Sequence, residues 1–149
     1  MSVISAKLAR MVNLDVTYEG NLRCSAVHGP SGNELVTDAP VDNHGRGEAF
    51  SPTDLVGTAL GSCLLTVMGI AARARQLELK GTNVHVVKEM TTERPRRIAR
   101  LTVKVTFPPE VSQQVDATTR SELQRIAENC PVRLSLSSDV DSPMTFEWQ

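Results

Sequence analysis

The sequence predicts one α+β domain in which a long buried helix separates two groups of strands. Strand-like segments come first, an uncharged helical segment follows, and a hairpin, a second helix and a last strand complete the chain. Strands and helices grouped in this way are typical of α+β folds, whereas regular alternation would indicate a doubly wound sheet. A chain of 149 residues has the length of one domain, which we place at residues 1–149.

The N-terminal third reads as three short strands followed by a loop. Alternating apolar and polar residues predict the strands, which cover 15–18, 23–27 and 34–37. Glycine-containing turns at 19–21 and 29–32 separate them. Residues 39–50 then form a polar segment with Gly45 and Gly47, which we expect to be a loop.

The long helix is predicted by 18 residues without a charge, Leu55 to Ala72. Its start is marked by Ser51 as N-cap, Pro52 at the first helical position and Asp54 at the third, near the positive end of the helix dipole. The length just reaches that of a membrane span. Six glycine, serine and threonine residues dilute its apolarity, so we interpret it as a buried helix of a soluble protein.

Such a helix needs cover on more faces than one small sheet provides, so a second helix or a second subunit is expected against it. Gly57 and Gly61 lie four residues apart on one face and would permit the close approach of another backbone. Each glycine lowers helix propensity by up to about 1 kcal/mol, which tertiary packing must offset.

The C-terminal half contains the clearest strand. Residues 99–107 alternate strictly between apolar and polar side chains. Residues 82–90 read as the partner strand, joined to it by a charged turn. Apolar positions from Val111 to Ala127 predict one further helix that ends near Asn129. A short helix is expected after Pro131, and residues 144–148 read as the last strand.

Composition excludes several classes of function. Sixteen basic and 17 acidic residues give a net charge of −1, which argues against a basic nucleic-acid-binding protein. Aromatic residues make up only 3% of the chain, too few for a base-stacking platform. Three widely spaced cysteines do not form a secreted disulfide framework, and residues 1–13 lack the apolar core of a signal peptide. We therefore expect a cytoplasmic protein with reduced cysteines.

Cys130 is the cysteine with the more informative local sequence. Pro131 favours the first position of a helix, so Cys130 would be its N-cap, where backbone N–H groups lower a thiol pKa. Arg133, one turn on, would add positive charge. The alternative is a small apolar residue filling a helix junction, and the local sequence leaves both open.

Cys63 lies in the middle of the uncharged helix, where a free cysteine usually packs as a small apolar side chain. An alternative is a helix that breaks and restarts at Gly61–Cys63, with Ser62 as a local cap. Cys24 lies in a predicted strand and reads as structural. The three histidines have no ligand spacing with any cysteine, so no metal site is expected.

Several motifs together resemble the OsmC/Ohr family, the osmotically inducible and organic hydroperoxide resistance proteins, in its general OsmC-like branch. The resemblance runs from about Asp15 to Trp148, nearly the whole chain, and its motifs are Phe50-Ser51-Pro52-Thr53-Asp54-Leu55, Ala59-Leu60-Gly61-Ser62-Cys63 and Glu128-Asn129-Cys130-Pro131-Val132. The resemblance implies antiparallel sheets wrapped around two long central helices in an intertwined homodimer. It also implies two active sites at the dimer interface.

The resemblance further implies a thiol peroxidase for organic hydroperoxides, with Cys63 as the peroxidatic and Cys130 as the resolving cysteine. A dithiol reductant, of lipoyl type in Ohr members, would restore the disulfide, and no cofactor, metal, nucleic acid or membrane is implied. Peroxidase members use a glutamate and an arginine beside the thiolate. Thr53 occupies the glutamate position here, so Asp54 is the candidate carboxylate, and Arg46 or Arg23 is the candidate arginine.

Two function classes follow from this comparison of motifs. The first is a cysteine-dependent peroxidase that acts in oxidative-stress defence. The second is an OsmC-fold protein with weak peroxidase activity that binds a small molecule or acts as a general thiol–disulfide protein. Reaction with an organic hydroperoxide, followed by loss of free thiol, would discriminate between them.

Overall fold

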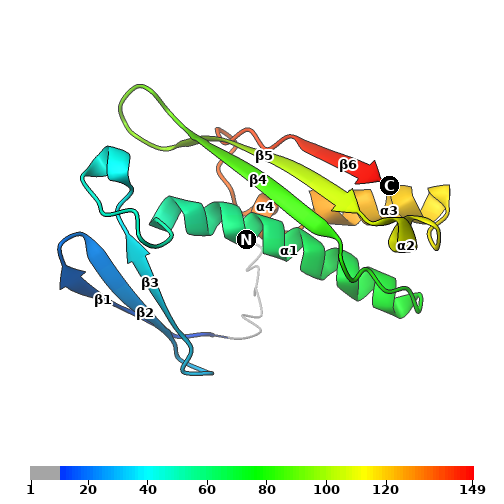
Figure 1. Ribbon diagram of the computed structural model, residues 1–149, viewed down its shortest axis with the longest axis horizontal. Coiled ribbons are helices and arrows are strands. Elements are labelled where there is room, and N and C mark those ends of the chain that lie inside the picture. Colours follow the sequence, from blue (N-terminus) through cyan, green and yellow to red (C-terminus); the bar gives the residue numbers. More distant parts are fainter. Residues whose placement is uncertain (1–10) are drawn as a thin grey trace, which may run out of the picture. The chain divides into compact units, whose positions relative to one another are not determined.

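The computed structural model describes residues 11–149, which divide into two compact units at the start of the long helix. The first unit ends at Pro52 and the second begins at Thr53 (Figure 1). The N-terminal residues 1–10, which contribute to the prediction that there is no signal peptide, lie outside the described residues.

The N-terminal unit is a three-stranded antiparallel sheet with the order β1-β2-β3. The three strands are confirmed and slightly longer than predicted: β1 is Leu14–Gly20, β2 is Arg23–His28 and β3 is Glu34–Asp38. The segment that follows is more ordered than a loop, since it contains the 3₁₀ turn η1 at Val41–Asn43. A Cβ on Gly45 would lie 1.6 Å from the Ala39 carbonyl oxygen, so only glycine fits there.

One face of this sheet is apolar and exposed. The register places Leu14, Val16 and Tyr18 of β1 on the same face as Leu35 of β3. The three β1 side chains are 64–66% exposed. Residues that are apolar yet exposed to this extent indicate a surface that binds a partner.

The C-terminal unit places helices against one face of a second three-stranded sheet, with the order β4-β5-β6 (Figure 1). Its elements are α1 at Pro52–Ala74, β4 at Asn83–Met90, β5 at Ile98–Phe107, α2 at Pro109–Ser112, α3 at Ala117–Glu128, α4 at Pro131–Leu134 and β6 at Met144–Trp148. The predicted alternation along β5 is confirmed, because Leu101, Val103, Val105 and Phe107 are all fully buried. They form one core with Leu60, Leu64 and Met68 of α1, and with residues of α2 and α3.

Two predictions about this unit are wrong. The single helix expected up to Asn129 is two helices, α2 and α3, because the Asp116 carboxylate accepts a hydrogen bond from the Thr119 N–H at 2.7 Å and caps a new helix. The sheet is also not wholly antiparallel. Strand β6 pairs in parallel with β5. The chain between the two strands forms α2, α3 and α4 and returns to the end of the sheet where β5 begins.

Helix α1 begins at Pro52 as predicted and is continuous through Ala74. The alternative of a break near Cys63 is therefore wrong, and Ser62 instead donates to the Ala59 carbonyl at 3.3 Å. The close approach expected at the glycine pair is confirmed, with β4 as the neighbouring segment. Gly57 and Gly61 face the sheet, where a Cβ would lie 3.5 and 3.3 Å from methyl groups of Val86. Their small size lets α1 approach β4.

By length and composition alone, α1 is the one helix in residues 11–149 that could cross a membrane. The core helix of a soluble protein passes the same test, and α1 buries one face in the core just described. Only 33% of its most apolar 18-residue window is buried, so much of the helix is uncovered in a single chain.

Candidate functional site

Two of the three cysteines meet in the core of the C-terminal unit. Cys63 projects from the fourth turn of α1 and is half-buried, whereas Cys130 precedes α4 and is fully buried. Both belong to the same apolar cluster, and their side chains interact with each other. All three cysteines are free thiols. The local structure that sequence analysis predicted for Cys130, the N-cap of a short helix started by Pro131, is confirmed.

The environment of Cys130 raises the pKa of its thiol. Burial is the largest cause, and the neighbouring Cys63 sulfur adds to it because two adjacent thiolates repel each other. The backbone N–H groups of Arg133 and Val132 act in the opposite direction, although neither makes a full capping hydrogen bond. Of the two alternatives left open for Cys130, the one with a lowered thiol pKa is therefore wrong, since desolvation outweighs the helix terminus.

Sequence analysis suggested that the Arg133 side chain adds positive charge next to the Cys130 sulfur. In the structure, this side chain bonds other groups instead. Its Nη1 donates to the Glu128 carbonyl oxygen at 2.7 Å and its Nε donates to the Ser142 hydroxyl at 3.1 Å. Arg133 therefore ties together the chain segments on both sides of Cys130.

Asp54 lies in an ion pair that sequence analysis missed. The Lys88 ammonium, from β4, lies 2.5 Å from Asp54 Oδ1 and donates to Thr53 Oγ1 at 2.8 Å. Nine residues separate Asp54 from Cys63, which corresponds to 2.5 turns of an α-helix. In one chain the two side chains thus leave opposite faces of α1, about 14 Å apart along its axis. Only the alternation of β4, which points Lys88 toward the helices, could have indicated this pair.

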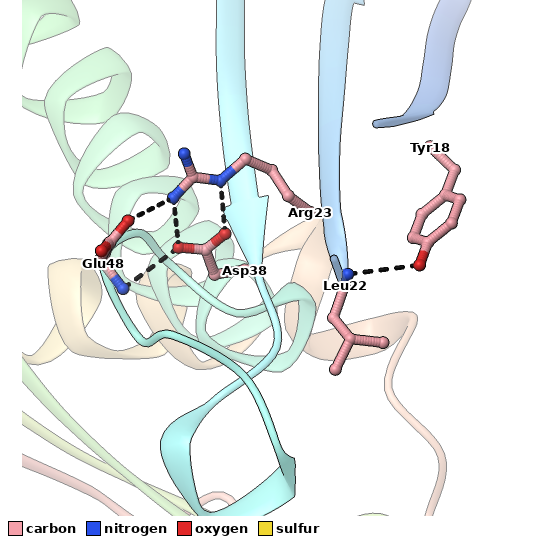
Figure 2. A network of polar contacts seen from close by, with 5 residues as sticks. All are labelled: Tyr18, Leu22, Arg23, Asp38 and Glu48. Carbon is pink, nitrogen blue, oxygen red and sulfur yellow. Dashed lines mark hydrogen bonds and ion pairs between the residues drawn. The ribbon is translucent and has the colours of Figure 1, made fainter. Parts of the chain in front are cut away.

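The two candidate arginines belong to the N-terminal unit and differ in their partners. Arg23 donates from Nε and Nη2 to both carboxylate oxygens of Asp38, at 2.7 and 2.9 Å, and from Nη2 to Glu48 at 2.7 Å (Figure 2). The Glu48 N–H also donates to Asp38 at 3.1 Å. Arg46 lies exposed in the loop before α1 and acts on Asp38 only through its charge.

This network fixes the loop between β3 and α1. Asp38 is 1% exposed, and the Arg23 guanidinium beside it lowers the pKa of its carboxyl group. The two carboxylates in turn raise the pKa of Arg23 further above its already high ordinary value. Arg23 therefore serves as an anchor whose charge is already balanced by Asp38 and Glu48.

No group of three His, Cys, Asp or Glu side chains that could hold a metal ion occurs in residues 11–149. Cys24 lies on β2, half-buried and opposite Tyr18 and Thr37 in the sheet register. It belongs to the other unit from the Cys63–Cys130 pair.

The fold and the thiol pair define an α+β protein with a dithiol in its core. Residues 45–142 match the family model described as OsmC-like protein, so the chain belongs to the OsmC-like family. A comparison with curated proteins gave no match.

Solved structures agree with this family. A protein of Psychrobacter arcticus 273-4, described as an osmotic stress induced and detoxification response protein, is 42% identical with a TM-score of 0.84, over 95% of this chain and 99% of that one. An organic hydroperoxide resistance protein OsmC of Legionella pneumophila is 14% identical with a TM-score of 0.72, over 95% and 99%. One from Elizabethkingia anophelis, with bound thiocyanate, is 12% identical with a TM-score of 0.74, over 96% and 99%. The last two support the fold alone.

Proposed function

We propose that this protein is a cysteine-dependent peroxidase that reduces organic hydroperoxides to alcohols in oxidative-stress defence. The observation that carries the proposal is the interaction between the half-buried Cys63 and the buried Cys130 in one core. Family membership supports it, and some structurally similar proteins are called organic hydroperoxide resistance proteins.

In the proposed reaction the Cys63 thiolate attacks one peroxide oxygen and the O–O bond breaks. The leaving alkoxide takes a proton and departs as the alcohol, while Cys63 becomes a sulfenic acid. The Cys130 thiol then attacks the Cys63 sulfur, so a disulfide forms and water is released. A dithiol reductant, of lipoyl type, exchanges with the disulfide, restores both thiols and is itself oxidised.

The order of the two cysteines follows from their surroundings. Cys63 is the more accessible sulfur, while Cys130 is sealed from solvent and has a raised thiol pKa. A protonated, buried thiol is a poor first nucleophile but can react with a sulfenic acid formed beside it. This difference favours Cys63 as the peroxidatic and Cys130 as the resolving cysteine.

Arg46 is the better candidate for the arginine that stabilises the thiolate. Arg23 is held by two carboxylates, so little of its charge remains to stabilise another anion. Asp54 of the same chain leaves the opposite face of α1 from Cys63. We therefore propose that any carboxylate acting on Cys63 at this position comes from a second subunit.

We also propose that the protein is a homodimer in the cytoplasm. The outer face of α1 carries no charge and is exposed at Thr58, Ser62, Thr66 and Ile70. The apolar face of β1 is exposed as well. A second copy would cover both surfaces, since large apolar areas are typical of obligate dimers.

Sedimentation equilibrium at micromolar concentration tests the dimer. Ser62→Arg places a charge on the outer face of α1 and should convert the dimer to a monomer or prevent folding. Thr102→Arg is the matched control, because Thr102 is exposed on the outer face of β5. A wild-type protein that is a stable folded monomer would contradict the proposal.

A second function is favoured by one observation: Asp54, the only carboxylate near the family's glutamate position, is already paired with Lys88. An OsmC-fold protein that lacks a free carboxylate there would be a weak peroxidase. It would instead bind a small molecule or act as a general thiol–disulfide protein.

A single-turnover assay with cumene hydroperoxide discriminates between the two functions and tests both cysteine roles. Cys63→Ser should reduce thiol loss to the background rate, because a serine hydroxyl is un-ionised at neutral pH. Cys130→Ser should keep the first turnover, and excess hydroperoxide should then oxidise the Cys63 sulfenic acid to the sulfinic acid, visible by mass spectrometry. Cys24→Ser is the control and should behave as wild type.

Peptide mapping of the oxidised wild type should show a Cys63–Cys130 disulfide within one chain and a free Cys24. If Cys63→Ser consumes hydroperoxide at the wild-type rate, or if Cys24 is found in the disulfide, the proposed mechanism is wrong. A wild type that is inert toward organic hydroperoxides would favour the second function.

A further inference from the structure

The Arg133 side chain links the two ends of the segment that carries Cys130. The chain leaves α3 at Glu128, passes Cys130 and enters α4 at Pro131. The Arg133 side chain reaches back from α4, and its Nη1 donates to the Glu128 carbonyl oxygen at 2.7 Å. This hydrogen bond closes the six-residue stretch 128–133 into a ring. Cys130 lies inside that ring.

A second bond of the same guanidinium fixes the ring to the next part of the chain. Arg133 Nε donates to the Ser142 hydroxyl at 3.1 Å, in the segment that leads into β6. Arginine suits this position because its planar fork presents two donors in a fixed geometry. A lysine ammonium would reach one acceptor but would not reproduce the fork.

The conformation of this ring matters because Cys130 depends on its backbone for its contacts. The Arg133 and Val132 N–H groups face the Cys130 sulfur, and the sulfur in turn faces Cys63 on α1. Motion of the ring would change all of these contacts together. Holding one reactant in place relative to the other raises its effective concentration.

We propose that Arg133 is a positioning residue that holds Cys130 within reach of Cys63. The proposal rests on the proposed function for its use in catalysis, because resolution of a Cys63 sulfenic acid requires this reach. Arg133 acts through the backbone of residues 128–133 and contacts neither substrate nor sulfur with its side chain.

The test is the thiol–disulfide equilibrium with glutathione, which uses no hydroperoxide. The two protein thiols give up two electrons and two protons to one glutathione disulfide, and two glutathione thiols form. The equilibrium constant reports how favourably Cys63 and Cys130 are placed for a disulfide. Failure of the proposed peroxidase function would therefore leave this experiment interpretable.

Arg133→Met should lower the equilibrium constant about tenfold, which raises the reduction potential by about 30 mV. Arg133→Lys and Ser142→Ala each keep part of the network and should lower it about threefold. Arg97→Met is the matched control. Arg97 also makes two side-chain hydrogen bonds, in its case both to backbone carbonyls, those of Ile98 and Asp139, but it does not hold the Cys130 segment.

In the hydroperoxide assay, Arg133→Met should leave the first thiol loss unchanged and slow disulfide formation, so that more Cys63 sulfinic acid accumulates. An equal shift of the equilibrium in Arg133→Met and Arg97→Met would overturn the proposal, and so would no shift in Arg133→Met. Ser142→Ala keeps the test valid if Arg133→Met does not fold, because an unchanged equilibrium constant in Ser142→Ala would also contradict it.

Discussion

The two units differ in how well one chain covers their apolar residues. The C-terminal unit has a continuous core in which Leu64, Met68 and Phe107 are fully buried. In the N-terminal unit, Leu14, Val16 and Tyr18 remain 64–66% exposed, and the buried side chains of its sheet are Thr37 and Asp38. One unit is thus held by apolar burial, and the other by hydrogen bonds and ion pairs.

The two units also carry different parts of the candidate site. The cysteine pair lies in the unit with its own core, where side-chain positions are fixed by close packing. The candidate arginines lie in the unit whose apolar face is uncovered. We infer that the thiol pair forms within each subunit, whereas the environment of the thiolate is completed only on assembly.

The largest expected effect comes from placing a charge in each unit. Leu64→Asp puts an unpaired carboxylate in a fully buried site and should cost more than about 4 kcal/mol, which prevents folding. Val16→Asp changes an exposed side chain and should leave the helical circular dichroism of the C-terminal unit intact while weakening the proposed dimer. Far-UV spectra and sedimentation of both variants make the comparison. Equal loss of structure in both would show that the units do not differ in this way.

Much of the C-terminal core could be predicted because strand alternation depends only on neighbouring residues. Residues 99–107 showed which side chains of β5 are buried, and Pro131 marked the start of α4. The break between α2 and α3 could also have been predicted, since an aspartate three residues before Thr119 is typical of a helix N-cap. The apolar spacing that continues from Val111 obscured this signal.

Contacts that join distant segments could not be predicted from local patterns. The Asp54–Lys88 pair joins residues 34 apart, and Arg23 and Asp38 meet only through the β2–β3 register. The orientation of Gly57 toward the sheet depends on how α1 is rotated. The raised pKa of Cys130 depends on its burial, which a helix cap in the sequence does not reveal.

The second prediction compares one carboxylate from each unit as pH falls. Hydrogen bonds lower the pKa of Asp38, chiefly from Arg23, and of Asp116, chiefly from the Thr119 N–H. A lowered folded-state pKa means that each carboxylate stabilises the native state fully above its unfolded pKa of about 3.9. That stability is lost as pH falls below this value and through the folded pKa.

Hydrogen exchange at two amides measures this loss. The Glu48 N–H is bonded to Asp38 and the Thr119 N–H to Asp116. After correction for intrinsic exchange, protection of both should fall between about pH 4 and pH 2. Asp116→Asn should make Thr119 protection insensitive to pH, because asparagine also caps helices. Asp38→Asn should lower Glu48 protection at every pH, since it loses the ion pair with Arg23. Unchanged Glu48 protection would contradict the role of this network.

The smallest expected effect tests whether Asp54 has a chemical or only a structural role. Lys88 is 19% and Asp54 41% exposed, so the pair should contribute no more than about 1 kcal/mol to unfolding free energy. Lys88→Met and Asp54→Asn should therefore destabilise the protein equally and slightly. Lys104→Met is the control, because it breaks a comparable pair with Glu147 at 2.8 Å.

If Asp54 only anchors the start of α1, both variants should consume hydroperoxide at the same rate as Lys104→Met. If Asp54 acts on Cys63 across a dimer, Asp54→Asn should slow the first thiol loss while Lys88→Met, which releases the carboxylate from its partner, should not. Slowing by Lys88→Met alone would contradict both descriptions of this carboxylate.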